Sequence, residues 1–142
     1  MAAAIAWADL VSRLDSAQIA LNGVLVKIAY PNSDFSLPSQ AEPWMRVEMS
    51  YGDSSPQELG DAAMWLETGQ AIIDVMAMSG TGLDDTISII DQLKATFRGP
   101  PYDPVVYYRV MADPGGSGSD DGLYWVTSIR AEWRVQSIVE RV

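Results

Sequence analysis

Residues 81–99, TGLDDTISIIDQLKATFRG, form the stretch that decides the fold class. Thr81, followed three residues later by Asp84, is similar to a capping box and predicts a helix start. Gly99 and the two prolines after it predict the end of the helix. Apolar residues at helical spacing predict one buried stripe, formed by Leu83, Ile87, Ile90, Leu93 and Phe97. We therefore predict an amphipathic helix over residues 81–98 that packs on a sheet.

The stretches on both sides of this helix are typical of strands, because they alternate apolar with polar residues or are rich in β-branched residues. Five strands are predicted, at Val24–Tyr30, Trp44–Tyr51, Met64–Met78, Val105–Ala112 and Leu123–Val135. Connections rich in proline, glycine and polar residues are predicted at 31–43, 52–63 and 113–122. Residues 2–20 predict a first helix, which Asn22-Gly23 ends.

Alternation also assigns the faces of the last two strands. In the first of them, one face is predicted to carry Val106, Tyr108 and Val110, and the other Tyr107 and Arg109. In the final strand, one face is predicted to carry Trp125, Thr127, Ile129, Ala131 and Trp133. These patterns indicate half-buried strands of a sheet with one covered face.

Strands that follow one another without helices between them favour an α+β fold. We predict a mainly antiparallel or mixed sheet of four to five strands, with two helices packed on it. A length of 142 residues is typical of one domain, which we place over residues 1–142.

Composition excludes several classes of function. The chain has no cysteine and no histidine, so disulfides, thiolate or imidazole metal sites and histidine-based catalysis are all excluded. Nine basic residues against nineteen acidic ones give a net charge of −10, which disfavours an electrostatic grip on nucleic acid. No apolar run approaches the ~18–20 residues that span a bilayer, and the N-terminus does not read as a signal peptide, so we expect no membrane association.

Two stretches are weak candidates for ligand sites. Residues 113–122, DPGGSGSDDG, fail as a calcium loop, because Gly115 and Tyr124 stand where liganding side chains are needed. Ser79–Gly82 begins a helix but lacks the lysine and the spacing of a phosphate-binding loop. We therefore expect no metal, no cofactor and no enzymatic activity.

Five short motifs follow one another over most of the chain. They are Ile28–Asn32 with Phe35, Pro38 and Trp44–Val47; Gly69–Val75; Gly80–Gly82; Phe97–Gly99; and Gly122–Val126. As an ordered set, covering about residues 2–136, they resemble the motifs of the tail terminator proteins of long-tailed bacteriophages. The chain departs from that family in its acidic stretch 52–68, where the family often has a basic or polar glycine-rich connection.

The resemblance implies an α+β fold and a structural role in the virion. Such a protein forms a ring, commonly a hexamer, that caps the head-proximal end of the tail tube. The ring stops tube polymerisation and offers the surface on which the head docks. The implied partners are further copies of the chain, the tail tube protein and a head-completion or stopper protein, while DNA passes through without specific binding. The protein would be made in the cytoplasm of the bacterial host.

Aromatic residues and long loops are typical of interfaces. We expect the connections 31–43 and 52–63 to reach a neighbouring subunit, with Phe35 and Trp44 as aromatic anchors. Three acidic residues of the second connection, Asp53, Glu58 and Asp61, have three open interpretations: they meet a basic strip of the next subunit, line the bore of the ring, or only form a solvated face. The basic strip would include Arg130 and Arg134 near the C-terminus.

Three other functions remain alternatives. Another neck protein, such as a head–tail stopper or a tail-completion protein, would differ by binding the portal complex instead of the tube. A carboxylate-based hydrolase would need two carboxyl groups ~5–9 Å apart across a cleft. A small-ligand-binding domain would need a deep apolar pocket.

Overall fold

The computed structural model describes residues 2–38, 42–56, 62–78, 80, 82–98, 104–113, 117–118 and 124–140. Within them the helices and strands are α1 (Ala2–Ala17), β1 (Ala20–Leu21), β2 (Val24–Leu25), β3 (Lys27–Ala29), β4 (Trp44–Pro56), β5 (Ala62–Met78), α2 (Asp84–Phe97), β6 (Val105–Ala112), β7 (Ser117–Gly118) and β8 (Tyr124–Glu140).

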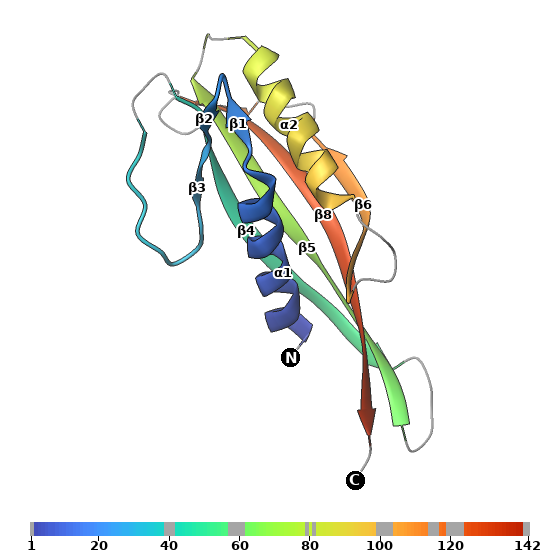
Figure 1. Ribbon diagram of the computed structural model, residues 1–142. Helices are drawn as coiled ribbons and strands as arrows, with labels where there is room; N and C mark the ends of the chain where they lie inside the picture. Colours follow the sequence, from blue (N-terminus) through green and yellow to red (C-terminus); the bar gives the residue numbers. More distant parts are fainter. Residues whose placement is uncertain are drawn as a thin grey trace.

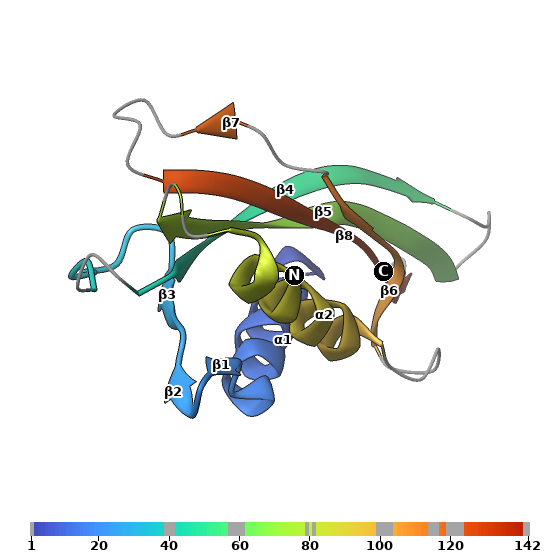
Figure 2. The same ribbon diagram turned by 90° about the horizontal axis from the view of Figure 1, so that it is seen from above.

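These elements form two layers, a curved sheet and a pair of helices on one of its faces (Figures 1 and 2). The strand order is β3-β4-β5-β8-β6, and β7 also pairs with β8. β3 runs parallel to β4, whereas all the other neighbours in this sheet are antiparallel. The predicted α+β class, with two helices on a mainly antiparallel mixed sheet, is confirmed. The sheet has one strand more than predicted, because β7 lies inside the stretch 113–122 that was expected to be a loop.

The central strands β5 and β8 pair over their full lengths, from Ala62 opposite Glu140 to Met78 opposite Tyr124. Gly69 permits the close approach of three strands at one point of this pairing. A Cβ atom at Gly69 would overlap both the indole of Trp133 and the carbonyl oxygen of Ser50. Glycine at this position therefore lets Trp133, the largest buried side chain of the sheet, pack directly against the backbone of β5.

The hydrophobic core lies between the sheet and the helices. β5 and β8 supply small and β-branched residues that pack well on a pleated surface. Longer side chains from both helices fill the space above them. Fully buried members of the core include Ala71, Ile73, Val75, Ile129 and Ala131 from the sheet, and Leu10, Leu14, Ile89, Leu93 and Phe97 from the helices.

The buried face of α2 differs from the predicted stripe. The buried residues are Thr86, Ile89, Leu93 and Phe97, with Ile90 packed at the margin. Ile87 is 50% exposed and so is Leu83, which precedes the helix. At 3.6 residues per turn, Ile87 lies about 120° around the axis from Leu93, so both cannot face the sheet. The three isoleucines at positions 87, 89 and 90 are compatible with two different buried faces. Packing on the sheet selects the face that contains Ile89.

The start of α2 also differs from the prediction. The helix begins at Asp84, and Leu83 occupies the N-cap position without a side-chain hydrogen bond. Thr81, the expected capping residue, lies outside the described residues, as do Gly99 and the two prolines after it. Asp84 and Asp85 lie in the first turn, where the helix dipole stabilises negative charge.

The first helix is shorter than predicted, because Asn22-Gly23 is a hairpin turn and not a helix end. α1 stops at Ala17, and Gln18 adopts a positive φ of 47°. Asn22 and Gly23 have φ values of 52° and 81°, as a two-residue turn between twisted strands requires. The turn joins β1 to β2, and the side-chain amide of Gln92 in α2 bonds both backbone groups of Ala20.

The predicted connection 52–63 is mostly strand. β4 continues to Pro56 and β5 already begins at Ala62, with a register irregularity between Tyr51 and Ser54. Together with the end of β8, these segments form an arm that extends past the helices (Figure 1). We define the arm as residues 51–56, 62–68 and 136–140. Antiparallel pairing of β5 with β4 on one side and β8 on the other outweighs the polar composition that indicated a loop, because it satisfies the backbone on both sides of β5.

The alternation predicted for β6 is wrong, because a bulge interrupts the strand. Tyr107 pairs with Trp133 and Arg109 with Glu132, so Tyr108 is the extra residue. Tyr107 and Val110 both pack on the core, although simple alternation puts them on opposite faces. In β8 the predicted face is confirmed for Thr127, Ile129, Ala131 and Trp133, which are buried, whereas Trp125 is 37% exposed.

Ile89→Ala and Ile87→Ala test the corrected face of α2. Ile89 is fully buried, so its truncation should lower the free energy of unfolding by about 2–5 kcal/mol. Ile87 projects from the same helix into solvent, and its truncation should change stability by less than about 0.5 kcal/mol. Urea denaturation of the isolated chain measures both values. Equal losses in the two variants would contradict this packing.

Candidate interaction surfaces

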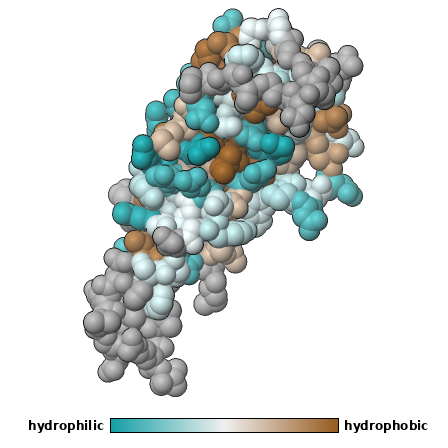
Figure 3. Space-filling view, turned by 180° about the vertical axis from the view of Figure 1, so that it is seen from behind, coloured by the Kyte–Doolittle hydropathy of each residue, from teal (hydrophilic) through white to brown (hydrophobic). Residues whose placement is uncertain are grey.

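The sheet face opposite the helices is open and mostly hydrophilic (Figure 3). Alternate residues of each strand point to it, because their neighbours in sequence are buried under the helices. On β8 the residues between the buried positions are Arg130, Glu132 and Arg134, and on β4 they are Arg46 and Glu48. Charges of both signs therefore lie on the face of the sheet that the helices do not cover.

A charged side chain is anchored at the centre of this face. Asp74 lies on β5 and is only 8% exposed. Arg46 on β4 donates from Nη2 to Asp74 Oδ2 at 2.7 Å, and Ser128 on β8 donates from its hydroxyl to Asp74 Oδ1 at 2.6 Å. The Arg46 Nε atom is also 3.8 Å from Glu48 Oε1. These contacts join three adjacent strands and satisfy a carboxylate that would otherwise be buried at a cost.

Three aromatic rings cluster at the end of the sheet opposite the arm. Phe35 comes from the β3–β4 connection, and its ring centroid is 5.1 Å from that of Trp44. Trp44 begins β4 and meets the edge of Tyr124, at the start of β8, with centroids 5.9 Å apart. All three side chains are half-buried. The cluster therefore fastens the connection to the sheet and leaves part of each ring accessible.

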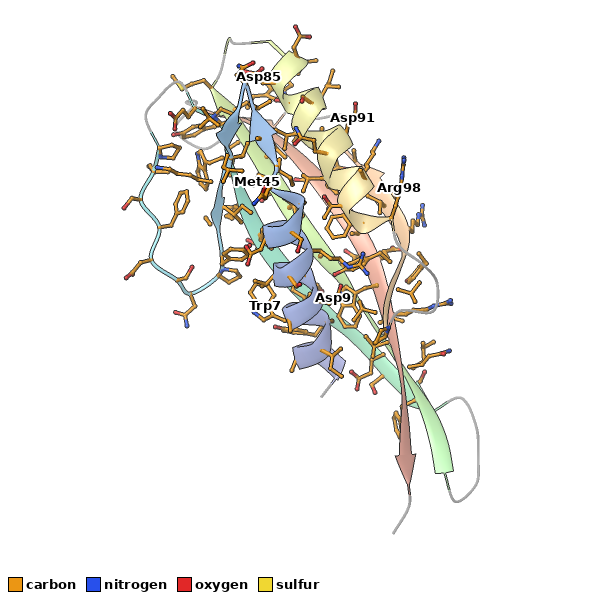
Figure 4. All side chains as sticks on the ribbon, in the orientation of Figure 1. Trp7, Asp9, Met45, Asp85, Asp91 and Arg98 are labelled. Atoms are coloured by element: carbon orange, nitrogen blue, oxygen red, sulfur yellow. The ribbon has the colours of Figure 1, made fainter. Side chains whose placement is uncertain are left out.

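A second charged cluster lies under the helices and ties them to β6. Arg13 of α1 donates from Nε to Asp9 Oδ2 at 2.6 Å, and its guanidinium lies 5.1 Å from the ring centroid of Tyr107. Tyr107 in turn packs on Phe97, with centroids 4.7 Å apart. Burial raises the pKa of the Tyr107 phenol, and the Asp9 carboxylate raises this pKa further, against a lowering by Arg13. Figure 4 shows Asp9 on α1.

The predicted interface residues do not form one site. Phe35 and Trp44 contact each other in the aromatic cluster. Arg130 and Arg134 are exposed on β8, on the open face, opposite Ile72 and Thr68 of β5. Trp44 lies in the row of Val126 on β8, four residues before Arg130 and eight before Arg134, so the aromatic pair and the arginines occupy different parts of the sheet.

Of the three predicted acidic residues, the structure describes the backbone of one. Asp53 lies in β4 within the bulged part of the arm, and its side chain is not among those described. Glu58 and Asp61 lie outside the described residues, between the end of β4 and the start of β5.

Sequence reasoning missed the Arg46–Asp74–Ser128 contact. One signal was available, since Asp74 interrupts the apolar run AIIDVMAM in the strand predicted at Met64–Met78. A carboxylate at such a position needs a partner on a neighbouring strand. Neither partner could be named, because the strand order was unknown.

The described residues contain no cluster of three or more acidic side chains suited to hold a metal ion. Among the described segments, neither helix has the length and apolar character needed to cross a membrane.

A protein-family model described as phage tail terminator protein matches residues 6–133. The chain belongs to the phage tail terminator family. The predicted family is therefore confirmed, and with it a structural role in a bacteriophage tail. This family consists of structural proteins and not of enzymes.

A solved protein structure is similar to this chain in fold. It superimposes with a TM-score of 0.64 at 19% sequence identity, and the match covers 92% of each chain. No curated protein sequence matches the chain.

The buried phenol of Tyr107 predicts a loss of stability at high pH. An exposed tyrosine in the unfolded chain ionises near pH 10, whereas the folded protein keeps Tyr107 protonated well beyond that. The unfolded state therefore binds fewer protons above pH 10, and the free energy of unfolding falls as the pH rises. In Tyr107→Phe this fall should be shallower between about pH 10 and 12, as urea titrations at stepped pH would measure.

Tyr51→Phe is the matched control, because it removes the hydroxyl of a ring that is 65% exposed. Its pH profile should keep the slope of the unmodified chain. A Tyr107→Phe profile parallel to that of the unmodified chain would contradict the assigned burial of Tyr107.

Proposed function

We propose that this terminator forms a ring, commonly of six copies, that caps the head-proximal end of the tail tube. The ring stops tube polymerisation and offers the docking surface for a head-completion or stopper protein. Family membership over residues 6–133 is the observation that carries the proposal. The protein would be made in the cytoplasm of the host bacterium and would have no enzymatic activity.

Three surfaces of the chain support a role in assembly. The open face carries charges of both signs, the arm extends past the helices, and the aromatic cluster leaves three rings partly accessible. Partners in such a ring contact each other through two different patches, since a head-to-tail contact closes when its rotation permits. We infer that the arm reaches the neighbouring copy or the tube, and that Phe35 and Trp44 contribute at the opposite end of the sheet.

Electron microscopy of the chain with purified tail tubes tests the proposed function. Negative stain should show a ring at one end of each tube, and tubes capped in this way should stop growing when tube protein is added. Binding to portal complexes, without binding to tubes, would instead support a head–tail stopper. Tubes that stay uncapped and keep growing would contradict the proposal.

Acidic residues of the arm region give a test for the passage of DNA. If Asp53, Glu58 and Asp61 face the bore of the ring, their negative charge keeps DNA from adhering. Changing all three to lysine should then make assembled rings retain DNA, in a manner that weakens as salt rises. A filter-binding assay at stepped salt concentrations measures this retention.

The control for this charge reversal is Asp84→Lys with Asp85→Lys and Asp91→Lys, which makes the same charge change on the exposed side of α2. Retention by both triple variants would reflect net charge only. Rings of the arm variant that assemble but retain no DNA would assign these acids to an interface or to solubility.

A further inference from the structure

We propose that the ring closes by antiparallel pairing of β6 of one copy with β4 of the next copy, so that one sheet continues around the assembly. The inference rests on the proposed ring and identifies the surface that holds it together. The inference follows from the unpaired strands at the two edges of the sheet, from the directions of these strands, and from the registers that relate their residues.

Both edges of the sheet have backbone without a partner strand. β6 is the last strand of the order and pairs only with β8. β3 pairs with β4 only from Trp44 to Arg46, so β4 has no described strand on that side from Val47 onward. An open hollow lies beside this part of β4, lined by Trp7, Pro31, Glu48, Met49 and Tyr51. Unpaired strand edges are templates for pairing with another chain.

The outward backbone groups of β6 can be assigned from one hydrogen bond. Asp113 donates its backbone N–H to the carbonyl oxygen of Ser128 at 2.9 Å. In an antiparallel ladder, residues alternate between those that bond the neighbouring strand and those that point away from it. Val110 and Ala112 therefore direct their N–H and C=O groups away from β8, toward the free side.

The directions of the strands suit this contact. From β4 through β5 and β8 to β6, each strand is antiparallel to the one before. β6 consequently runs opposite to β4. A second copy related by rotation about an axis along the strands presents its β4 antiparallel to β6 of the first copy, which is the more stable pairing. The contact joins two different edges and is heterologous, as a ring requires.

Residues of the two edges also lie in the same rows of the sheet, where a row is a line of residues paired across neighbouring strands. Arg109 pairs with Glu132, which pairs with Gln70, which pairs with Ser50. By the same route Ala112 lies in the row of Val47. The regular stretches 109–112 and 47–50 thus occupy the same four rows, with a bulge beyond each. The bulges end the ladder on one side, and β3, which pairs with β4 up to Arg46, ends it on the other, so the contact stays short.

Side chains on the two stretches match in face and charge. In these rows Val110 and Met49 both pack on the helix side of the sheet. On the open side, Arg109 is exposed and lies one diagonal step from the row of Glu48. Opposite charges at such positions stabilise paired strands and fix their register. A slip by one residue would turn apolar side chains to the open face, so only shifts of two residues are allowed.

Cysteine cross-linking tests this pairing directly, because the chain has no cysteine of its own. Ser50→Cys with Arg109→Cys places a thiol on each edge of the same row. Within one chain these positions are three strand spacings apart, about 14 Å, too far for a disulfide. Oxidation of the assembled ring should therefore convert most of the chain to covalent oligomers on a denaturing gel, and a reductant should return it to monomer. Glu48→Cys with Arg109→Cys covers a register shifted by two residues.

Ser50→Cys with Asp91→Cys is the control. Asp91 is exposed on α2 (Figure 4), in the helix layer on the other side of the sheet from Ser50, so this pair should stay monomeric. Equal cross-linking of the control and the edge pairs would overturn the proposal. Rings that form normally in the microscope but cross-link through neither edge pair would also overturn it, and would leave the proposed ring intact. If no ring forms at all, the result would instead contradict the proposed function.

Hydrogen exchange provides a test without substitutions. In assembled rings of the unmodified chain, the amides of Val110 and Ala112 should exchange at least tenfold more slowly than in the unassembled chain, because they gain acceptors on β4. The amide of Asp113 already bonds Ser128 and serves as the internal reference. Unchanged exchange at Val110 and Ala112 on assembly would overturn the edge pairing.

Discussion

Seventeen residues of β5 pair in unbroken antiparallel register with seventeen of β8, and every other element takes its place from this ladder. The register puts Ala71 beside Ala131 and Ile73 beside Ile129, which creates the apolar floor of the core. It also puts Gly69 beneath Trp133, where no larger residue would fit. Because side chains alternate along a strand, a shift of one residue would exchange the core face with the open face along the whole sheet.

The helices cover only one face of that sheet, so the opposite face is left without a covering layer. A two-layer α+β fold leaves one sheet face in contact with solvent unless a partner covers it. Here that face holds a buried carboxylate, Asp74, between Arg46 and Ser128, surrounded by exposed charges of both signs. A chain that belongs to a tail structural family thus presents polar surfaces that can be reached without disturbing its core.

The two edges of the sheet also have backbone groups without a partner strand. β6 and the part of β4 beyond Arg46 lie on opposite edges, each strand carries a bulge, and each has a stretch with no strand beside it among the described residues. Natural proteins usually cover or blunt such edges, since an unpaired strand recruits other chains. Edge pairing between copies would give these unpaired strands a defined partner, and the bulges would end the paired stretch on one side.

The sequence by itself determined the α+β class, the family, the helix near residues 84–97 and the approximate places of the main strands, because each depends on local periodicity or on motifs. Only the tertiary structure decided that Ile89 and not Ile87 faces the core, that Asn22-Gly23 turns a hairpin, and that residues 52–56 and 62–63 are strand segments of an arm. It also decided that Asp74 meets Arg46 and Ser128, which are 28 and 54 residues away. These features depend on strand order and on competition between nearly equivalent faces for the same core, and neither is encoded within any short stretch of the chain.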